Sequence, residues 1–315
     1  MVGEQAKPAA RAKPAAPRVL GAIAARWAPD LNRDMMLLLG VLCGLGQAAG
    51  LLPAPVDASA YWLAGTSTNL YPAAWAEIAP GYLFYPPPVA QLSALLQPIG
   101  WGVFITILTT AIFASVWYCA GRWSLPLLAI GLPWLVWGVG PTEANVFLGY
   151  ALLGNLQWIL AALAIVALRH PGLWAIQLVT KVTTAIGWWW HVFRAEWRAA
   201  AIGVAASVAV VAVSFAFAPQ LWFEFIAFAL RNGSMANPPI AMFPVPFGVR
   251  LASAMLVLAW GARTNRPWTV PVAVGWSIPA LYGLGFLPFW VAGWKVRQMT
   301  RRAAIDASKT APSRA

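Results

Sequence analysis

Hydrophobic positions in this chain form long runs, separated by short segments that carry most of the charged residues. The first run, residues 35–53, has about the length that a helix needs to cross a bilayer core, roughly 20 residues. Further apolar segments lie at about 101–120, 123–140, 145–168, 172–192, 199–217, 249–262 and 268–293. The pattern predicts an all-α, polytopic membrane helix bundle with about eight to ten transmembrane or re-entrant helices.

Composition supports a membrane protein. Of the 315 residues, 61% are hydrophobic and 10% are charged, with a mean hydropathy of +0.68, whereas soluble domains carry about 25% charged residues. The formal net charge is +12, but Lys and Arg concentrate in tails and short loops, which is how membrane orientation is encoded. We therefore expect membrane lipids, and no nucleic acid, as partners. Cys43 and Cys119 lie in apolar runs without metal-ligand spacing, so no metal site is expected.

The basic residues also predict the topology. Residues 1–34 are expected to form a disordered basic cytoplasmic tail, residues 35–295 a single transmembrane bundle, and residues 296–315 a second basic cytoplasmic tail. Long outer loops then fall at 54–98 and 218–248. The N-terminus is cytoplasmic in this topology, and Asp57 emerges on the outer face.

Two apolar segments fit this topology badly, because basic residues lie at both of their ends. Residues 172–192 are flanked by Arg169 and Arg194, and residues 268–293 by Arg266 and Lys295. Each is expected to be a pair of short helices or a re-entrant hairpin, since broken helices occur where they line a cavity. A local failure of the charge rule is the alternative.

Carboxylates are scarce, which shortens the list of candidates for acid–base chemistry. Five of the nine lie in tails or beside basic clusters, which leaves Asp57, Glu77, Glu143 and Glu224. Asp57, at the outer end of the first helix, can take a proton from an attacking hydroxyl as a general base. An ordinary interfacial aspartate is the alternative.

Tyrosines accompany Asp57 in the first outer loop. Tyr61 follows by four residues, on the same face of a helix, where it can orient the carboxylate, stack on a sugar or belong to an aromatic belt. Tyr85 precedes three prolines, which cannot lie within a helix and predict a rigid elbow.

Other polar residues interrupt the apolar runs. Asn155 and Gln157 are expected to face the bundle interior, for helix–helix hydrogen bonds or for ligand contact. Lys181 lies deep in its segment, where its natural partner is a phosphate or carboxylate, although it can also extend to an interface. Arg231 and Arg250, on the outer face, can pair with a phosphate or with Glu224.

Several of these motifs occur together in a known family. The chain resembles the polyprenyl-phosphate-sugar-dependent membrane glycosyltransferases of family 87, of the GT-C fold class, over most of residues 35–275. The motifs are Asp57-x3-Tyr61, Leu70-Tyr71, Phe84-Tyr85-Pro86-Pro87, Gly154-Asn155-Leu156-Gln157 and Thr180-Lys181-Val182-Thr183. The chain departs from many relatives at Thr184, where they carry proline, and in reading Gly-Asn-x-Gln instead of Gly-Gln-x-Asn.

The resemblance implies a GT-C-like bundle and an inverting, metal-independent enzyme of the bacterial plasma membrane that needs no cofactor. The enzyme would move a sugar, mannose or a pentose, from a polyprenyl-phosphate donor to a lipid or envelope glycan acceptor on the outer face. Asp57 would be the general base, and the expected substrate-binding residues are Tyr61, Tyr85, Asn155, Gln157, Lys181, Arg231 and Arg250. Two alternatives stay open: a polyprenyl-lipid flippase or transporter, and an inactive relative that acts as a scaffold.

Overall fold

Helix α1 (Ala16–Ala48) opens the fold in a computed structural model of the chain. The structure describes residues 16–67, 69–71, 85–132, 147–233, 245–279 and 285–310. Every regular element in these ranges is helical, which confirms the all-α prediction for this part of the chain. Two of the four candidate carboxylates, Glu77 and Glu143, lie outside the described residues.

The remaining helices vary widely in length. They are α2 (Val56–Ala64), α3 (Pro87–Leu96), η2 (Gln97–Ile99), α4 (Trp101–Ala120), η3 (Gly121–Trp123), α5 (Ser124–Ala129), α7 (Leu148–Leu152), α8 (Gln157–Ala167), η5 (Pro171–Leu173), α9 (Trp174–Thr180), η6 (Val182–Trp188), α10 (Trp189–Phe193), α11 (Trp197–Phe217), α12 (Pro219–Gly233), α13 (Phe247–Arg263), α14 (Thr269–Trp276) and α15 (Leu287–Thr310).

Helices α1 and α4 pack antiparallel and in close contact. A Cβ atom added to Gly40 would lie 2.8 Å from Thr110 Cα, and one added to Gly44 would lie 2.5 Å from Thr106 Cα. Small residues four apart allow such close backbone approach between membrane helices. Residues 16–34 belong to α1, although the sequence predicted a disordered tail up to residue 34.

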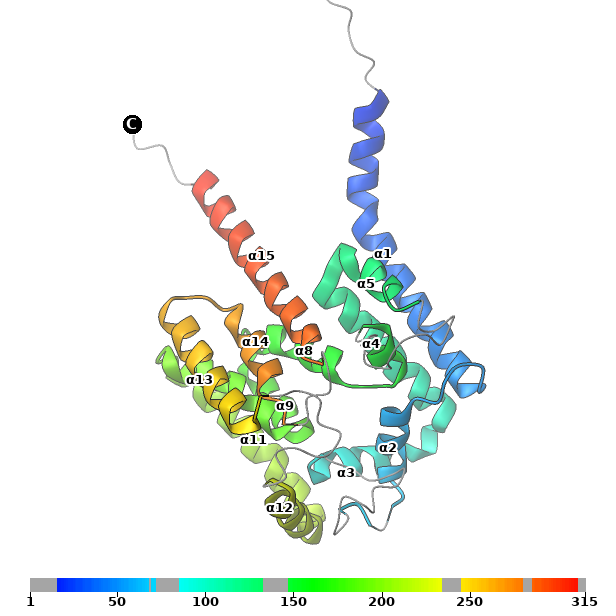
Figure 1. Cartoon of the computed structure of the whole chain (residues 1–315), viewed down its shortest axis with the longest axis vertical. Helices are drawn as coiled ribbons and strands as arrows, with labels where there is room; N and C mark the ends of the chain where they lie inside the picture. The colour runs from blue at the N-terminus through cyan, green and yellow to red at the C-terminus, as the bar shows by residue number, and fades with distance from the viewer. Residues whose placement is uncertain are drawn as a thin grey trace, which may run out of the picture.

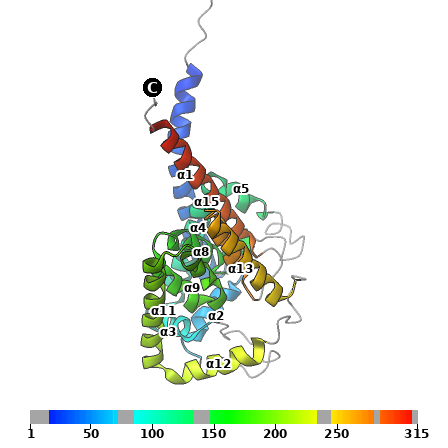
Figure 2. The ribbon, with the colours of Figure 1, turned by 90° about the vertical axis from the view of Figure 1, so that its left-hand side faces the viewer.

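The molecule is elongated, with different elements at its two ends (Figure 1). Helices α1 and α15 extend from one end, whereas α2, α3 and α12 lie at the other. Helix α11 runs along the long axis and α12 turns across its end (Figure 2). The start of α1 and the end of α15 therefore both lie at the end of the molecule opposite α2.

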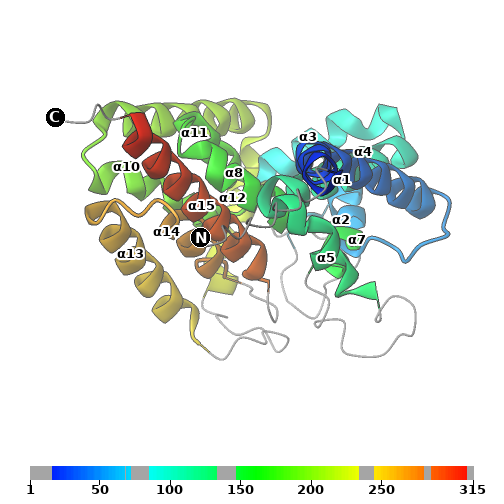
Figure 3. The same ribbon diagram turned by 90° about the horizontal axis from the view of Figure 1, so that it is seen from above.

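Helix α8 occupies the centre of the core. It packs against α4, α9, α14 and α15, and Trp158, Ala161 and Ala164 on it are fully buried. Seen from above, α1 and α4 lie on one side of α8, and α11, α13 and α14 lie on the other (Figure 3). Helix α8 therefore lies where the two sides meet.

Both segments that were predicted to be interrupted are interrupted. Residues 172–192 divide into η5, α9, η6 and α10, with the main break at Lys181. In residues 268–293, α14 ends at Trp276 and α15 begins at Leu287. Helix α15 then continues to Thr310, where a tail was expected from residue 296.

Two helical stretches in the described part are long and apolar enough to cross a membrane, by length and composition alone. They are Trp101–Ala129 and Trp197–Phe217. Other apolar segments form shorter helices, such as the 11-residue α8. Part of the segment that was predicted to be the second outer loop is the 15-residue helix α12, which is shorter than the roughly 20 residues of a spanning helix.

Candidate active site

Asp57 lies in the first turn of α2, and backbone contacts fix this turn against the loop between α7 and α8. The N–H groups of Asp57 and Ala58 donate to the carbonyl of Leu153, at 3.0 and 3.3 Å. Gly154 follows with φ +76°, and a Cβ atom there would lie 2.5 Å from Ala58 Cβ. Glycine alone suits both the positive φ and the close approach. This contact brings Asn155 to the carboxylate.

The amide of Asn155 is the direct partner of Asp57. Its Nδ2 donates a hydrogen bond of 2.7 Å to Asp57 Oδ2. Its Oδ1 accepts a bond of 3.0 Å from the N–H of Gln157, in an Asx turn at the start of α8. Because the acceptor end of the amide is held by an N–H, its donor end faces the carboxylate.

The Asp57 carboxyl group is mostly buried, and α2 lies outside the two candidate spans. Burial raises the pKa of Asp57 above its ordinary value, although the charge of Lys181 and the hydrogen bond from Asn155 act to lower it. A carboxylate with a raised pKa accepts a proton more readily near neutral pH.

Tyr61 and Tyr85 lie next to Asp57, and Tyr71 is bonded to Tyr85; these three side chains are called the tyrosine wall. The hydroxyl of Tyr61, one turn after Asp57, lies 3.0 Å from that of Tyr85, and their rings meet edge to face. The hydroxyl of Tyr71 donates to the Tyr85 carbonyl at 3.0 Å. Helix α3 begins with Pro87 just after Tyr85, so the proline run starts a helix, where proline is tolerated. Tyr71 was quoted in the family resemblance but was not predicted as a site residue.

Lys181 reaches this wall from the break between α9 and η6. It has an extended backbone, with φ −136° and ψ 100°, and its Nζ lies 5.7 Å from the centroid of the Tyr85 ring. Lys181 and Asp57 interact electrostatically, but the ion pairs of the described residues do not include one between them. The cation and the carboxylate therefore face the same region without neutralising each other by contact.

Buried hydrogen bonds hold the break at Lys181 in place. The Thr184 hydroxyl is within 2.6 Å of the Lys181 carbonyl and 3.1 Å of the Gln177 carbonyl. Gln177 is itself tied to the Leu160 carbonyl on α8 at 2.7 Å. Thr184, noted in the sequence only as a departure from relatives, thus supports the turn that presents Lys181.

Gln157 lies beside the same loop with its side chain almost wholly buried, at 2% exposure. Its Oε1 has no hydrogen-bond partner among the described residues. A Cβ atom on Gly285 would lie 3.1 Å from both Oε1 and Nε2. A buried carbonyl without a donor is costly, so a ligand hydroxyl at this position would relieve the cost.

Arg250 has a different set of partners from the expected phosphate or Glu224. It is 3% exposed, and its guanidinium donates to four backbone carbonyls at 2.5 to 3.3 Å, those of Val245, Trp276, Ile278 and Pro279. These bonds tie α13 to the break after α14. A sequence does not reveal this arrangement, because three of the four carbonyls belong to residues 276–279, which lie 26 to 29 positions further along the chain.

Arg231 lies in the last turn of α12 and is exposed. Helix α12 packs on α3 and α11, and Phe228, one turn before Arg231, contacts the Tyr71 ring with centroids 5.7 Å apart. The structure therefore places Arg231 on the helix next to the tyrosine wall. The predicted site residues that lie closer together are Asp57, Tyr61, Tyr85, Asn155, Gln157 and Lys181.

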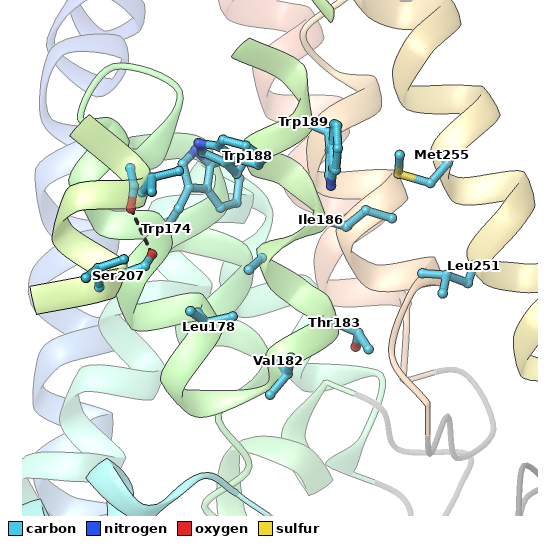
Figure 4. A pocket seen from close by; sticks show the side chains of 14 residues that line it. Trp174, Leu178, Val182, Thr183, Ile186, Trp188, Trp189, Ser207, Leu251 and Met255 are labelled. Carbon is cyan, nitrogen blue, oxygen red and sulfur yellow. Dashed lines mark hydrogen bonds between the residues drawn. The ribbon is translucent and has the colours of Figure 1, made fainter. Parts of the chain in front are cut away.

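An apolar cavity of about 490 Å³ is lined in part by Val182 and Thr183, which directly follow Lys181 in the chain. Figure 4 shows Val182, Thr183 and Ile186 of η6 on one side of it, with Leu251 and Met255 of α13 and Ser207 of α11 around them. Trp174, Trp188 and Trp189 complete the wall. The residues that directly follow Lys181 thus line an apolar cavity whose size suits part of a hydrocarbon chain.

We compared the chain with models of known protein families, with curated proteins and with solved structures, and none of the three comparisons found a match.

Proposed function

We propose that this chain is an integral membrane glycosyltransferase that moves a sugar from a polyprenyl-phosphate donor to an acceptor hydroxyl on the outer face. One observation carries the proposal: the carboxylate of Asp57, oriented by Asn155, faces the same region as Lys181, and the residues that directly follow this lysine line an apolar cavity. A lipid-phosphate sugar needs all three features, a base, a cation and an apolar cavity.

In the proposed reaction, Asp57 removes the proton of the acceptor hydroxyl. The acceptor oxygen then attacks the anomeric carbon with inversion, and the bond between that carbon and the phosphate oxygen breaks. The proton stays on the carboxyl group, and the electron pair leaves with the lipid phosphate. Lys181 offsets the negative charge that develops on this phosphate.

The tyrosine wall suits the sugar. The faces of aromatic rings pack against the apolar faces of sugars, and the hydroxyls of Tyr61 and Tyr85, 3.0 Å apart, can exchange their mutual bond for bonds to sugar hydroxyls. The Oε1 of Gln157, which has no hydrogen-bond partner among the described residues, offers a further acceptor. Sugar recognition would thus come from neutral groups, and phosphate recognition from Lys181.

Exposed apolar surface supports the membrane part of the proposal. Helix α11 exposes Ile202, Val208 and Phe217, and α12 exposes Phe223 and Leu230. Because α12 lies across the end of the bundle (Figure 2), it has the orientation expected of an amphipathic helix at a membrane surface. Water would contact all of these side chains if the protein were soluble.

A transfer assay tests the proposal. Membranes from cells that express the wild type or Asp57→Asn receive radiolabelled polyprenyl-phosphate mannose or pentose, and label in endogenous acceptors is measured. Because a positioned general base typically contributes 10²–10⁴-fold, Asp57→Asn should lower transfer by at least about 100-fold. Asp34→Asn is the matched control, since Asp34 is an exposed carboxylate that pairs with Arg33 at 2.9 Å. Equal transfer by wild type and Asp57→Asn would refute the assignment of Asp57.

The same cavity and lysine also favour a second candidate, a polyprenyl-lipid carrier. A carrier would need Lys181 to bind the phosphate but would not need a base. Movement of labelled lipid across vesicle membranes separates the two functions: a carrier loses movement in Lys181→Met and keeps it in Asp57→Asn. A glycosyltransferase loses sugar transfer in both variants.

A further inference from the structure

A second cavity, of about 510 Å³, lies between the end of α4 and the middle of α15. Its polar and aromatic lining includes Arg122, Trp123, Trp294, Lys295, Arg301 and Arg302. Four of these six side chains are cationic, and the described residues that line the cavity include no carboxylate. Asp306, one turn after Arg302, is the first acidic residue beyond them on α15.

Neighbouring rings and carbonyls hold two of the cations in position. Lys295 Nζ donates to the carbonyl of Tyr118 and lies 4.2 Å from the centroid of its ring. The Arg122 guanidinium lies 5.3 Å from the centroid of the Trp123 ring. These contacts with aromatic rings hold Arg122 and Lys295 beside the cavity, although the like charges of the two side chains repel each other. An anion between them would remove that repulsion.

The position of this cavity separates it from the proposed active site. It begins at the C-terminal end of α4, whereas the N-terminal end of that helix contacts α2, where Trp101 and Trp62 meet with ring centroids 5.9 Å apart. The 20 residues of α4 span about 30 Å, which is close to the thickness of a bilayer hydrocarbon core. The two sites would therefore face opposite membrane surfaces.

Two tryptophans line the second cavity beside the cationic side chains. Trp123 and Trp294 are 46% and 42% exposed, and exposed tryptophans are enriched where lipid headgroups begin. Basic cavities between helices on the cytoplasmic side are suited to anionic headgroups. An exposed aromatic ring next to a cation suits a molecule that has both a phosphate and acyl chains.

We propose that this cavity binds the phosphate of an anionic glycerophospholipid at the cytoplasmic face. The site depends on the membrane setting proposed above but not on glycosyl transfer. Arg122 and Lys295 would contact the phosphate oxygens, Arg301 and Arg302 would add charge at the headgroup, and Trp123 and Trp294 would pack against the glycerol and the first acyl carbons.

The test uses the purified full-length chain in neutral detergent micelles. Phosphatidylglycerol, phosphatidylcholine and soluble glycerol phosphate are titrated separately, and binding is followed by native mass spectrometry and by the thermal unfolding midpoint. We expect saturable binding of phosphatidylglycerol, with a rise of the midpoint, and no comparable effect of the other two. Equal binding of glycerol phosphate would overturn the lipid assignment, and equal binding of phosphatidylcholine would overturn the role of the charge.

Variants test whether the cavity itself is responsible. Because each cation near an anionic surface contributes about a fivefold gain in binding, Arg122→Gln with Lys295→Gln should weaken phosphatidylglycerol binding by about 30-fold. Arg266→Gln is the matched control, since Arg266 also stacks on a tryptophan, 4.7 Å from the Trp260 ring, but lies outside the cavity. Wild-type binding in the double variant would overturn the proposal.

Loss of the Lys295 bond to Tyr118 can itself disturb packing. The exposed pair Arg301→Gln with Arg302→Gln therefore provides a second arm, since these side chains line the cavity without being buried. Weaker phosphatidylglycerol binding in this pair, with an unchanged unfolding midpoint in the absence of lipid, supports the site. Unchanged binding in this pair contradicts the headgroup role of the two arginines.

Discussion

The Nδ2 atom of Asn155 lies 2.7 Å from Oδ2 of Asp57, across 98 residues of sequence. The contact explains the presence of a polar amide inside an apolar segment. The Oδ1 atom of Asn155 accepts a bond from the Gln157 N–H at the start of α8, and its Nδ2 atom orients the carboxylate. In the proposed enzyme, Asn155 is a positioning residue that also tunes the base.

Replacement of Asn155 should change the pH dependence of transfer. The hydrogen bond from Asn155 acts to lower the pKa of Asp57, so Asn155→Ala should raise that pKa. A general base works in its ionised form, and the acidic limb of the pH–rate profile should therefore move to higher pH. The measurement is transfer rate against pH in wild-type and variant membranes. Gln220→Ala, which removes an exposed amide bonded to Glu224, should leave the profile unchanged; a profile that does not move in Asn155→Ala would contradict the tuning.

Thr184 should contribute to stability through its hydroxyl. Thr184→Val removes the bonds to the carbonyls of Gln177 and Lys181, which should lower the free energy of unfolding by about 1 kcal/mol or more, because the Thr184 side chain is fully buried. Thermal unfolding in micelles, followed by tryptophan fluorescence, measures the change. Thr264→Val is the control, because the Thr264 hydroxyl bonds to a carbonyl at an exposed helix end. A loss no larger than that of the control would show that the hydroxyl does not support the break.

Arg250 should be a stabilising residue and not a donor-binding one. Arg250→Met leaves the carbonyls of Val245, Trp276, Ile278 and Pro279 without their donor, so stability should fall by about 3 kcal/mol or more. Arg263→Met, at the exposed end of the same helix, should cost about 0.5 kcal/mol or less. Unfolding midpoints and the KM for the lipid donor distinguish the roles. A raised KM with an unchanged midpoint would restore the phosphate-binding role expected from the sequence.

Glu196 should give the fold a pH dependence on the acid side. It accepts bonds from His191 Nδ1 at 2.8 Å and from Arg194 Nε at 2.6 Å. Burial acts to raise the pKa of Glu196, but these bonds and charges outweigh burial and hold the pKa below its ordinary value. Such a carboxylate stabilises the fold above its unfolded pKa, roughly 4.3, and this stabilisation is lost as the pH falls through the lower folded pKa.

The unfolding midpoint measured against pH tests this role of Glu196. Glu196→Gln should flatten the loss of stability below about pH 4. Glu224→Gln makes the same chemical change on α12, where the carboxylate accepts a bond from Gln220 at 3.2 Å, and should not flatten the curve. Parallel curves for wild type and Glu196→Gln would show that another group causes the acid dependence.

Local pattern was sufficient for part of the candidate site. The spacing of Asp57 and Tyr61 predicted a shared helix face, and both lie on α2. Basic residues at both ends of 172–192 predicted an interruption there, and the chain is extended at Lys181. These predictions needed only helical periodicity and the distribution of charge.

Tertiary contacts determine what the sequence could not show. The partners of Arg250 are backbone carbonyls, and any residue type provides a carbonyl, so no motif identifies them. The sequence predicted a disordered tail up to residue 34, because the start of the chain is rich in Ala, Pro and Lys. Helix α1 instead begins at Ala16. Tyr71 was missed as a site residue, since its role depends on the Tyr85 carbonyl.

The contact between α2 and the Gly154 loop has a consequence for biosynthesis. Asp57 leaves the ribosome well before Leu153, which anchors α2, and before Lys181, which supplies the opposing charge. Until residues 153–181 have been made, the carboxylate lacks its orienting amide, its electrostatic partner or both. A nascent or truncated chain that ends before Lys181 therefore carries the aspartate without a formed site, and the proposed chemistry would begin only after synthesis has passed this break.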